Sequence, residues 1–373
     1  MATRLAARPE QASTILQTKE PAPKQRWRAL PFRAAVGPHH CFVSSIVRPF
    51  SGHDDGWKLG PRQLKAWTVS EPKIGTLSQC VAVARHFDPS PTEKTFIAGR
   101  GFRRIFDPPL FRRSEHAPEL IISCGFRAEK RAMRIKAAYG GMPLSVHLQP
   151  PKIDGYDMVF VSRHGWRPEF ESRPGYFQML GVPHRFSAQF WQERRPAARA
   201  IYAPADEKVA AVFVGGPNDA YDYDAPAHEA IASAVNGLVD QNWKVLISVS
   251  RRSTEQTLHS LLKLRSKHVV VWDRFTPNPY VEFAAAADAF LIAKDSITMP
   301  CEALSTGRPV YVLELTPVPG ERLEKFEWYH RDLQETLGLT RPFNGDLAPY
   351  DYLPPRETER IAGIIKERLA DKG

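Results

Sequence analysis

The hydrophobic and polar positions fall into two similar series along the chain. From Lys65 onward, short runs rich in β-branched residues alternate with stretches whose apolar positions recur at helical spacing. This alternation is typical of βαβ units, which build a parallel sheet covered by helices. In the first series the predicted strands are Ala66–Val69, Thr95–Ala98, Leu120–Cys124, Leu144–Leu148 and Met158–Val161, and the predicted helices are about Leu77–His86 and Ala128–Tyr139.

The second series begins at Lys208. Before it, Gln192–Asp206 combines two prolines with arginines and alanines, which favours a connector. After Pro354-Pro355, the apolar positions of Arg356–Asp371 recur at helical spacing and predict a last helix. The strands predicted in this series are Val209–Val214, Val245–Val249, Val269–Trp272, Ala289–Ala293 and Val310–Leu313, and the helices are about Ala227–Gln241, Glu255–Ser266, Tyr280–Ala286 and Met299–Ser305.

The predicted fold class is therefore α/β, with two Rossmann-like domains whose parallel sheets face each other across a cleft. We expect an N-terminal domain at residues 65–200, a C-terminal domain at 207–345, and a tail at 346–373 whose helix packs back on the first domain. Residues 1–64 lack a sustained period and predict a disordered basic extension. In such sheets ligands bind beyond the carboxyl ends of the strands, so candidate residues belong in strand-to-helix loops.

Charge and cysteine content narrow the function classes. The net charge is +10, but residues 1–65 hold 11 lysines and arginines against four acids, which leaves about +3 for the remainder. The core therefore offers no obvious basic stripe for nucleic acid, and we expect no nucleic-acid partner. The four cysteines are scattered without metal-ligand spacing, and no apolar run reaches the ~18 residues of a membrane span. We expect a cytoplasmic protein.

Three loops carry candidate anion-binding groups. Gly75 and Thr76 follow the first strand, where Gly75 permits close approach of a phosphate and Thr76 can cap the next helix, with a plain structural turn as the alternative. Gly215-Gly216 ends the first strand of the second series, with a plain tight turn as the alternative. Ser250-Arg251-Arg252 precedes a helix that Ser253 or Thr254 can cap, and two arginines there favour a diphosphate clamp over a simple surface turn.

The most informative segment runs from Ala293 to Val310. A strand ends at Asp295-Ser296-Ile297-Thr298 and a helix begins, so free backbone N–H groups and two hydroxyls form an anion site. Glu302 lies one helical turn beyond Thr298, where a carboxylate can accept both hydroxyls of a ribose. The segment predicts a site for a nucleotide or another phosphorylated ligand. Nearby Asp222-Tyr-Asp224 resembles a metal-binding pair, but solvated loop acids are the simpler interpretation, and we expect no metal ion.

In the first series, two loops can face the same ligand. His164 follows a predicted strand and has the ordinary pKa that general-base catalysis requires, although a lone histidine is also a common structural residue. Gly125 and Arg127 follow another strand, and Arg127 can meet an acceptor or a phosphate.

These motifs together resemble the mitochondrial-fission (elongated-mitochondria) protein family over about residues 65–370. The last of them also resembles the donor half of two-domain GT-B glycosyltransferases, in which a matching glutamate holds the ribose. The motifs are G-x-x-x-Q (Gly75, Gln79), IISCG (Ile121–Gly125), QPP (Gln149–Pro151), DMVFVSRH (Asp157–His164), VGG (Val214–Gly216), SRRST (Ser250–Thr254), NPY (Asn278–Tyr280) and AKDSITMPCEALSTGRPV (Ala293–Val310).

The resemblance implies a metal-independent transferase that needs no cofactor beyond a nucleotide-diphospho-sugar as donor substrate. In that reading Asn278 joins the donor site, His164 deprotonates the acceptor, and the acceptor is an envelope or lipid-linked molecule at the inner membrane surface. Two alternatives use the same scaffold. One is a non-catalytic adaptor that recruits a membrane-associated partner, and the other is a nucleotide-sugar epimerase that acts without an acceptor.

Overall fold

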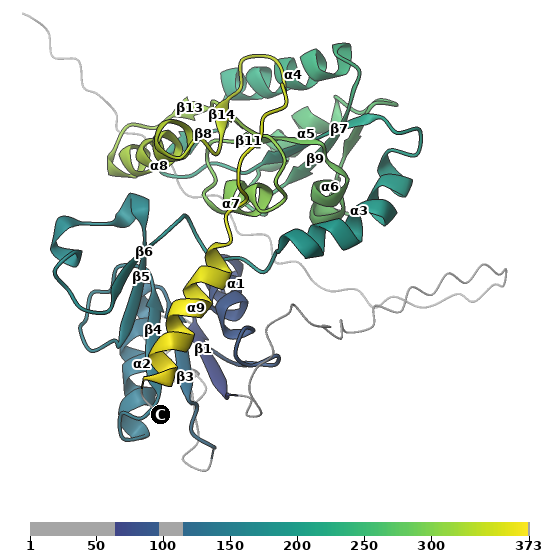
Figure 1. The fold of residues 1–373 in the computed structure, drawn as a ribbon. Helices are drawn as coiled ribbons and strands as arrows, with labels where there is room; N and C mark the ends of the chain where they lie inside the picture. Colours follow the sequence, from purple (N-terminus) through teal and green to yellow (C-terminus); the bar gives the residue numbers. More distant parts are fainter. Residues whose placement is uncertain (1–63, 97–114, 372–373) are drawn as a thin grey trace, which may run out of the picture. The chain divides into compact units, whose positions relative to one another are not determined.

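The computed structural model describes residues 64–96 and 115–371, which contain two parallel sheets (Figure 1). The predicted extension 1–64 therefore lies, except for Leu64, outside the described residues, and the predicted domain boundaries remain predictions. The helices of the described part are α1 (Ile74–Ala84), α2 (Phe126–Ala138), α3 (Ala188–Tyr202), α4 (Ala225–Asp240), α5 (Glu255–Leu262), α6 (Tyr280–Ala286), α7 (Thr298–Leu304), α8 (Glu321–Arg331) and α9 (Glu357–Ala370).

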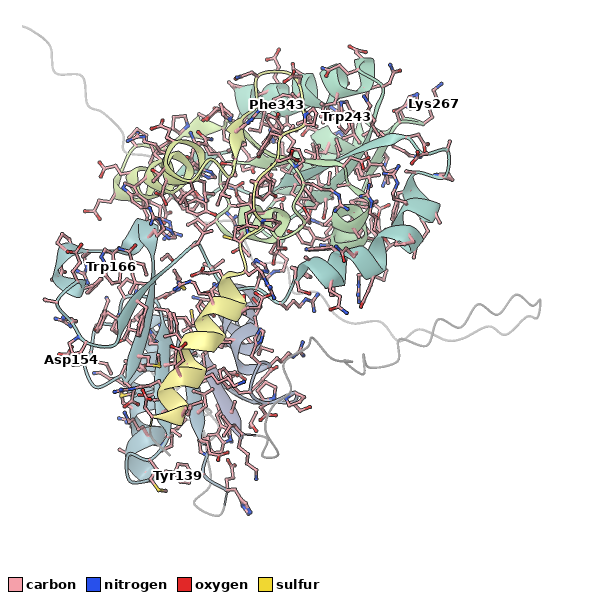
Figure 2. The ribbon with its side chains drawn as sticks, viewed as in Figure 1. Tyr139, Asp154, Trp166, Trp243, Lys267 and Phe343 are labelled. Carbon is pink, nitrogen blue, oxygen red and sulfur yellow. The ribbon has the colours of Figure 1, made fainter. Side chains whose placement is uncertain are left out.

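The first sheet has six strands in the order β2-β1-β3-β4-β5-β6, all parallel. Its central strands are buried along their whole length because helices cover both faces. On one face Tyr139, labelled in Figure 2, packs edge-on against Trp67 with ring centroids 5.8 Å apart. The strands are β1 (Ala66–Ser70), β2 (Thr92–Thr95), β3 (Leu120–Cys124), β4 (Leu144–Leu148), β5 (Met158–Ser162) and β6 (Tyr176–Met179).

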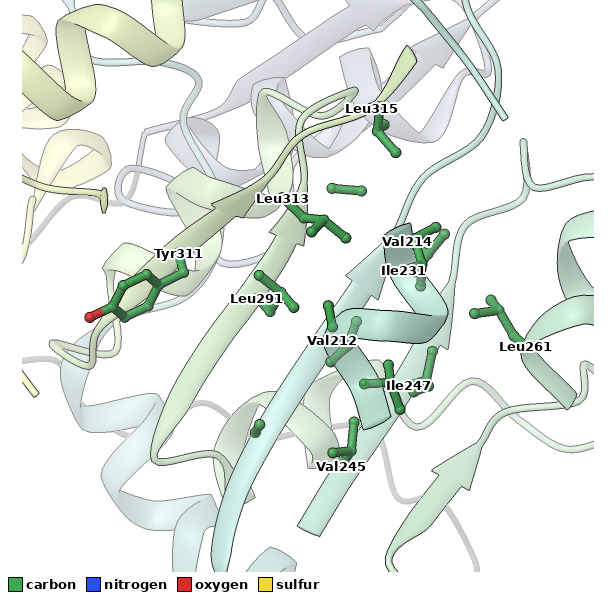
Figure 3. Close-up of a cluster of buried hydrophobic side chains, with 14 of the residues drawn as sticks. Val212, Val214, Ile231, Val245, Ile247, Leu261, Leu291, Tyr311, Leu313 and Leu315 are labelled. Atoms are coloured by element: carbon green, nitrogen blue, oxygen red, sulfur yellow. The ribbon is translucent and has the colours of Figure 1, made fainter. Parts of the chain in front are cut away.

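The second sheet also has six parallel strands, in the order β10-β9-β7-β11-β12-β14. Alternate residues of β7 enter two separate cores: Val212 and Val214 pack on one face, and Phe213 packs on the other. Figure 3 shows the first of these cores, where Val212 lies among Ile247, Leu291 and other aliphatic side chains. The strands are β7 (Lys208–Val214), β9 (Trp243–Val249), β10 (Val269–Val271), β11 (Ala289–Ala293), β12 (Val310–Leu313) and β14 (Arg341–Pro342), with β8 (Tyr221–Asp222) and β13 (Thr316–Pro317) forming a separate antiparallel pair.

The last helix packs on the first sheet, as predicted. Ile361, Ala362 and Ile365 of α9 belong to the same buried cluster as Leu120 of β3 and Val146 of β4. The α/β fold class with two parallel sheets is thus confirmed, whereas the cleft between the sheets remains a prediction.

Each sheet has one point at which the strand order reverses. In the first sheet the chain runs from β1 outward to β2 and returns to β3 on the other side of β1. In the second it runs from β7 outward through β9 and β10 and returns to β11 on the other side of β7. The loops after the two strands at a reversal diverge, which leaves room for a ligand between them. These reversals select the loops after β1 and β3 and those after β7 and β11.

The predicted connector Gln192–Asp206 was wrong, because most of it belongs to α3. Ser187 caps this helix by accepting a hydrogen bond from the N–H of Phe190, and Pro196 lies inside it. A proline in a helix interior costs about 3 kcal/mol. Tertiary packing offsets this cost, since Trp191 is buried and its Nε1 donates to Ser305 Oγ at 2.8 Å.

Two smaller differences concern missed or shifted elements. The strand predicted at Thr95–Ala98 is instead β2, and residues 97 and 98 lie outside the described part. Neither β6 nor α8 was predicted, because their hydrophobic patterns are weak. Helix α8 matters for the site because it contacts the turn that carries His164.

Candidate functional site

Asp295 connects the loops at the strand-order reversal of the second sheet. It follows β11, and its Oδ2 accepts hydrogen bonds from the N–H of Gly216 at 2.9 Å and from Nη2 of Arg252 at 2.8 Å. Its Oδ1 accepts a hydrogen bond from the Tyr223 hydroxyl at 2.7 Å. Burial raises the pKa of Asp295, while Arg252 acts in the opposite direction. The carboxylate is thus engaged inside the protein and joins the loops after β7, β9 and β11.

Gly215 and Gly216 are required by this internal packing. A Cβ on Gly215 would overlap the carboxylate of Asp295, and one on Gly216 would overlap the backbone of Arg252. The glycines were predicted to let a ligand approach. The structure shows that they let Asp295 and Arg252 approach, and contact with a ligand remains a prediction.

The loop after β9 has two arginines with different surroundings. Arg252 donates to the carbonyl of Gly216 at 2.7 Å in addition to its ion pair with Asp295. Arg251 is exposed. Ser250 Oγ accepts a hydrogen bond from the N–H of Arg252, and Thr254 caps α5 as predicted, by accepting from the N–H of Thr257. Both arginines are thus exposed, and Arg252 is the one engaged by Gly216 and Asp295.

Hydrogen bonds, one of them from a tyrosine of α8, hold the loop after β11. Ser296 Oγ accepts a hydrogen bond from the N–H of Met299 at 3.1 Å. The Tyr329 hydroxyl donates to the carbonyl of Ile297 at 2.9 Å. Thr298 is the first residue of α7. These bonds fix the backbone that was predicted to bind a diphosphate.

Glu302 lies in α7 as a half-buried carboxylate with one partner among the described residues. Its Oε2 accepts a hydrogen bond from the Tyr280 hydroxyl at 2.5 Å. Burial raises the pKa of Glu302 to about 7, although Tyr280 and the charge of Arg185 act to lower it. Asn278 supports this arrangement, because its Oδ1 accepts from the N–H of Tyr280 and from Ser248 Oγ. Asn278 was predicted at the donor site from the NPY motif, whereas Tyr280 of the same motif was missed.

The candidates of the first sheet lie at its own strand-order reversal. Gly75 and Thr76 are in the first turn of α1, which follows β1, and Gly125 follows β3. A Cβ on Gly125 would lie 3.9 Å from Thr76 Cγ2, so the two loops meet. The predicted capping role of Thr76 was wrong: its hydroxyl donates to the carbonyl of Lys73, and no side chain caps α1.

Arg127 is held by an ion pair at the start of α2. Its Nη1 lies 2.8 Å from Oε1 of Glu71, which comes directly after β1. The Arg127 side chain is 44% exposed, so it stays accessible from solvent. Contact of Arg127 with an acceptor remains a prediction.

His164 belongs to the turn Arg163–Gly165 after β5 and packs edge-on against Tyr329, with ring centroids 5.2 Å apart. Its Nδ1 is buried and has no hydrogen-bond partner within residues 64–96 and 115–371. Burial lowers the pKa of His164 to about 3, and the nearby Lys325 lowers it further. The histidine is therefore neutral at pH 7 and has a free ring nitrogen. Its turn is held by Arg163, whose Nε and Nη2 lie 2.7 and 2.8 Å from the two carboxylate oxygens of Asp332.

The acids first considered as a metal-binding pair have structural roles or stay at the surface. Asp224 caps α4 by accepting from the N–H of Ala227 at 3.0 Å, and it also accepts from the hydroxyl of Thr316. The residue between the two acids, Tyr223, is the one that reaches Asp295. In the part of the chain that the structure describes, no three metal-ligating side chains gather at one point.

Comparisons with known proteins agree with the resemblance. A protein of Arabidopsis thaliana, mitochondrial fission protein ELM1, is 24% identical over 285 residues, which are 69% of this chain and 65% of that protein. The chain thus matches somewhat less than two thirds of the length of the plant protein. An uncharacterised protein of Rickettsia prowazekii, RP120, is 23% identical over 354 residues, which are 82% of this chain and 99% of that protein.

Solved structures show weaker similarity. The glycotransferase of kitacinnamycin has 16% identity and a TM-score of 0.43, with 83% of this chain and 94% of that chain covered. The UDP-GlcNAc 2-epimerase of Neisseria meningitidis has 13% identity and a TM-score of 0.44, with 83% and 100% covered. ADP-heptose heptosyltransferase II of E. coli has 11% identity and a TM-score of 0.42, with 83% and 99% covered.

The match to a protein-family model extends over most of the chain. The model described as mitochondrial fission ELM1 matches residues 73–369, from just before α1 to the last turn of α9. The match therefore includes the second sheet, the strands of the first sheet other than β1, and the candidate residues at both strand-order reversals. On this basis, the protein belongs to the mitochondrial fission ELM1 family.

Proposed function

We propose that this protein is a metal-independent glycosyltransferase of the GT-B type. It binds a nucleotide-diphospho-sugar at the carboxyl edge of the second sheet and transfers the sugar to an acceptor held by the first. The observation that carries the proposal is Glu302, a half-buried carboxylate one helical turn beyond the Ser296–Thr298 loop. A carboxylate in that place can accept both hydroxyls of a ribose while the loop N–H groups meet the diphosphate.

The roles of the other groups follow from their accessibility. Arg251 is exposed beside the loop and can neutralise charge that develops on the leaving diphosphate. Arg252 and Asp295 act indirectly, because they bind each other and hold the loops in place. Gly215 and Gly216 allow this close packing.

His164 serves as the proton acceptor in the proposed reaction. The acceptor hydroxyl oxygen forms a bond to the anomeric carbon, and the bond from that carbon to the phosphate oxygen breaks, so the nucleoside diphosphate leaves with the electron pair. The hydroxyl proton moves to the imidazole of His164, which is half-buried and neutral without a ligand. The pKa of about 3 describes the chain without ligand. A bound diphosphate brings negative charge, which raises the pKa of a nearby histidine.

A membrane-linked acceptor is consistent with the exposed face of α2. Lys130 and Arg134 are exposed on this helix, and Phe126 at its start is 54% exposed. The single acid of α2, Glu129, is buried, so it does not balance these charges at the surface. A basic helical face with an exposed aromatic residue suits the surface of an anionic bilayer. Within the described residues, no helix combines the length and the apolar character of a membrane span.

The test of the donor site is calorimetric titration with UDP, GDP and their sugar conjugates. Glu302→Gln keeps an oxygen for the Tyr280 hydrogen bond but removes the charge that binds the ribose, and we expect at least about tenfold weaker nucleotide binding. Glu282→Gln changes an exposed glutamate of α6 in the same way and should bind like the wild type. Wild-type protein that binds none of these nucleotides, or equal binding by both variants, contradicts the donor site.

Product analysis separates transfer from its alternatives. A sugar nucleotide incubated with the protein and a lipid extract yields a glycosylated lipid if the proposal holds. A new epimer formed without any acceptor indicates an epimerase instead. His164→Ala should abolish transfer and leave nucleotide affinity within about twofold, because the histidine acts on the acceptor proton alone. Nucleotide binding without turnover of any acceptor, together with a partner protein retained by Glu302→Gln, favours an adaptor.

A further inference from the structure

A group of arginines lies at the amino edge of the second sheet, opposite the candidate donor loops. Asp288 directly precedes β11 and Arg308 comes two residues before β12, while Arg195 and Arg199 come from α3. The donor loops follow the carboxyl ends of these strands, so this group is separate from the proposed sugar-nucleotide site.

Two carboxylates belong to this group: the exposed Asp206, which lies 2.7 Å from Nη2 of Arg199, and Asp288, which two of the arginines share. Asp288 Oδ1 accepts from Nη2 of Arg195 at 2.5 Å, and Oδ2 accepts from Nη1 of Arg199 at 2.9 Å and from the N–H of Val209 at 2.9 Å. Arg195 also donates to backbone carbonyls at the end of α6, the shortest of these bonds being 2.7 Å to Ala287. Both arginines are thereby held in fixed positions beside Asp288, and Arg199 also pairs with Asp206.

Arg308 has no such partner. Its side chain makes no hydrogen bond or ion pair with any residue that the structure describes, and its Nη1 is completely buried. Burial, followed by the neighbouring charge of Arg195, lowers the pKa of Arg308 to about 10. The Tyr352 hydroxyl donates to the carbonyl of Arg308 at 2.8 Å and to that of Leu304 at 3.0 Å. These bonds fix the backbone of Arg308.

A fixed, partly buried guanidinium without an acceptor is costly, since its donors lose water without gaining a partner. Three guanidinium groups around the carboxylates of Asp288 and Asp206 also leave a local excess of one positive charge. A phosphate group fits both conditions: it carries up to two negative charges, and its oxygens match the forked donors of arginine. Water could satisfy the donors but could not balance the charge.

We propose that Arg308, with Arg195 and Arg199, forms a binding site for the phosphate group of a small molecule at the amino edge of the second sheet. This site goes beyond the proposed transferase function and does not depend on it. A phosphorylated small molecule bound here would stabilise the packing of α3 against the second sheet, because the arginines come from both.

Inorganic phosphate is the probe for the test, and Arg308→Gln is the principal variant. In phosphate-free buffer this variant should melt at the same temperature as the wild type or above it, because it removes an unpaired charge. Added phosphate should raise the melting temperature of the wild type only, and calorimetry should show at least about tenfold weaker phosphate binding by the variant. Arg368→Gln, which removes an exposed arginine of α9, should respond like the wild type.

Three results would overturn the site. The wild type shows no response to phosphate, or Arg308→Gln keeps the full response, or Arg308→Gln unfolds in phosphate-free buffer, which assigns the guanidinium a structural partner. Glu302→Gln distinguishes the two sites of this protein. If Glu302→Gln loses the phosphate response and Arg308→Gln keeps it, phosphate binds at the donor loops and not at Arg308. If nucleotides do not bind but phosphate binding still requires Arg308, only the proposed donor site is wrong.

Discussion

Arg252 and Asp295 close the strand-order reversal of the second sheet, with Nη2 of the arginine 2.8 Å from Oδ2 of the aspartate. The Asp295 side chain is fully buried, whereas that of Arg252 is 45% exposed. The pair thus joins a buried negative charge to a cation that is still in contact with solvent. Together with the bonds of Gly216 to both side chains, the pair links the loops after β7, β9 and β11.

Arg252→Ala should lower the free energy of unfolding by on the order of 2 kcal/mol, because it leaves a buried carboxylate without its cation. Arg251→Ala is the matched control, and its exposed side chain should contribute within about 0.5 kcal/mol. Urea denaturation of both variants measures the difference. Equal stability of the two variants would show that Asp295 does not need Arg252.

Gly215→Ala should destabilise the protein by about 1–3 kcal/mol, since the added methyl group overlaps the Asp295 carboxylate. Gly237→Ala offers a comparison, because this glycine lies inside α4 with open space around its Cα. There alanine favours the helix and should add about 0.5–1 kcal/mol. Thermal or urea unfolding should therefore move in opposite directions, and two shifts of the same sign would contradict the packing described for the loop.

Glu302→Gln should change stability in a pH-dependent way. Burial raises the pKa of Glu302 from 4.5 to about 7, so the folded state binds this proton more tightly than the unfolded chain. The wild type therefore loses stability as pH rises through this interval, and the variant does not. We expect Glu302→Gln to gain on the order of 2 kcal/mol relative to the wild type between pH 5 and pH 8. A constant difference across this range would show that the carboxylate is not desolvated.

Charge reversal on α2 tests the proposed membrane surface. Lys130→Glu combined with Arg134→Glu should weaken co-sedimentation with phosphatidylglycerol vesicles at least about 30-fold. The control is Lys263→Glu with Lys267→Glu, which makes the same charge change on exposed residues of the second half; Lys267 is labelled in Figure 2. Equal loss in both double variants would indicate a general charge effect, and no loss in either would exclude α2.

Much of the fold could be predicted because the sheets are buried on both faces. Strands such as Leu120–Cys124 and Ala289–Ala293 are continuous apolar runs, and their predicted bounds agree with the structure. Helix α3 was missed because Pro196 disfavours a helix locally, whereas Trp191 and Arg195 stabilise it through contacts distant in sequence.

The candidate site was predicted at the level of loops but not of contacts. The loops after β7, β9 and β11 do converge, as expected for the carboxyl ends of parallel strands. The engagement of Asp295 by Arg252 and Tyr223 depends on side-chain positions that no spacing rule specifies. Tyr280 beside Glu302 and Tyr329 below Ile297 were missed for the same reason, since each comes from another helix.

The position of α9 has a consequence for the order of folding during synthesis. Ile361, Ala362 and Ile365 complete the core of the first sheet, although more than 150 residues of the second sheet's region separate them from β6 in the chain. A ribosome releases the second sheet and its covering helices before these three side chains emerge. The core of the first sheet is thus completed last, and until then its apolar face is covered, of the described helices, by α1 alone and is a natural binding site for a chaperone.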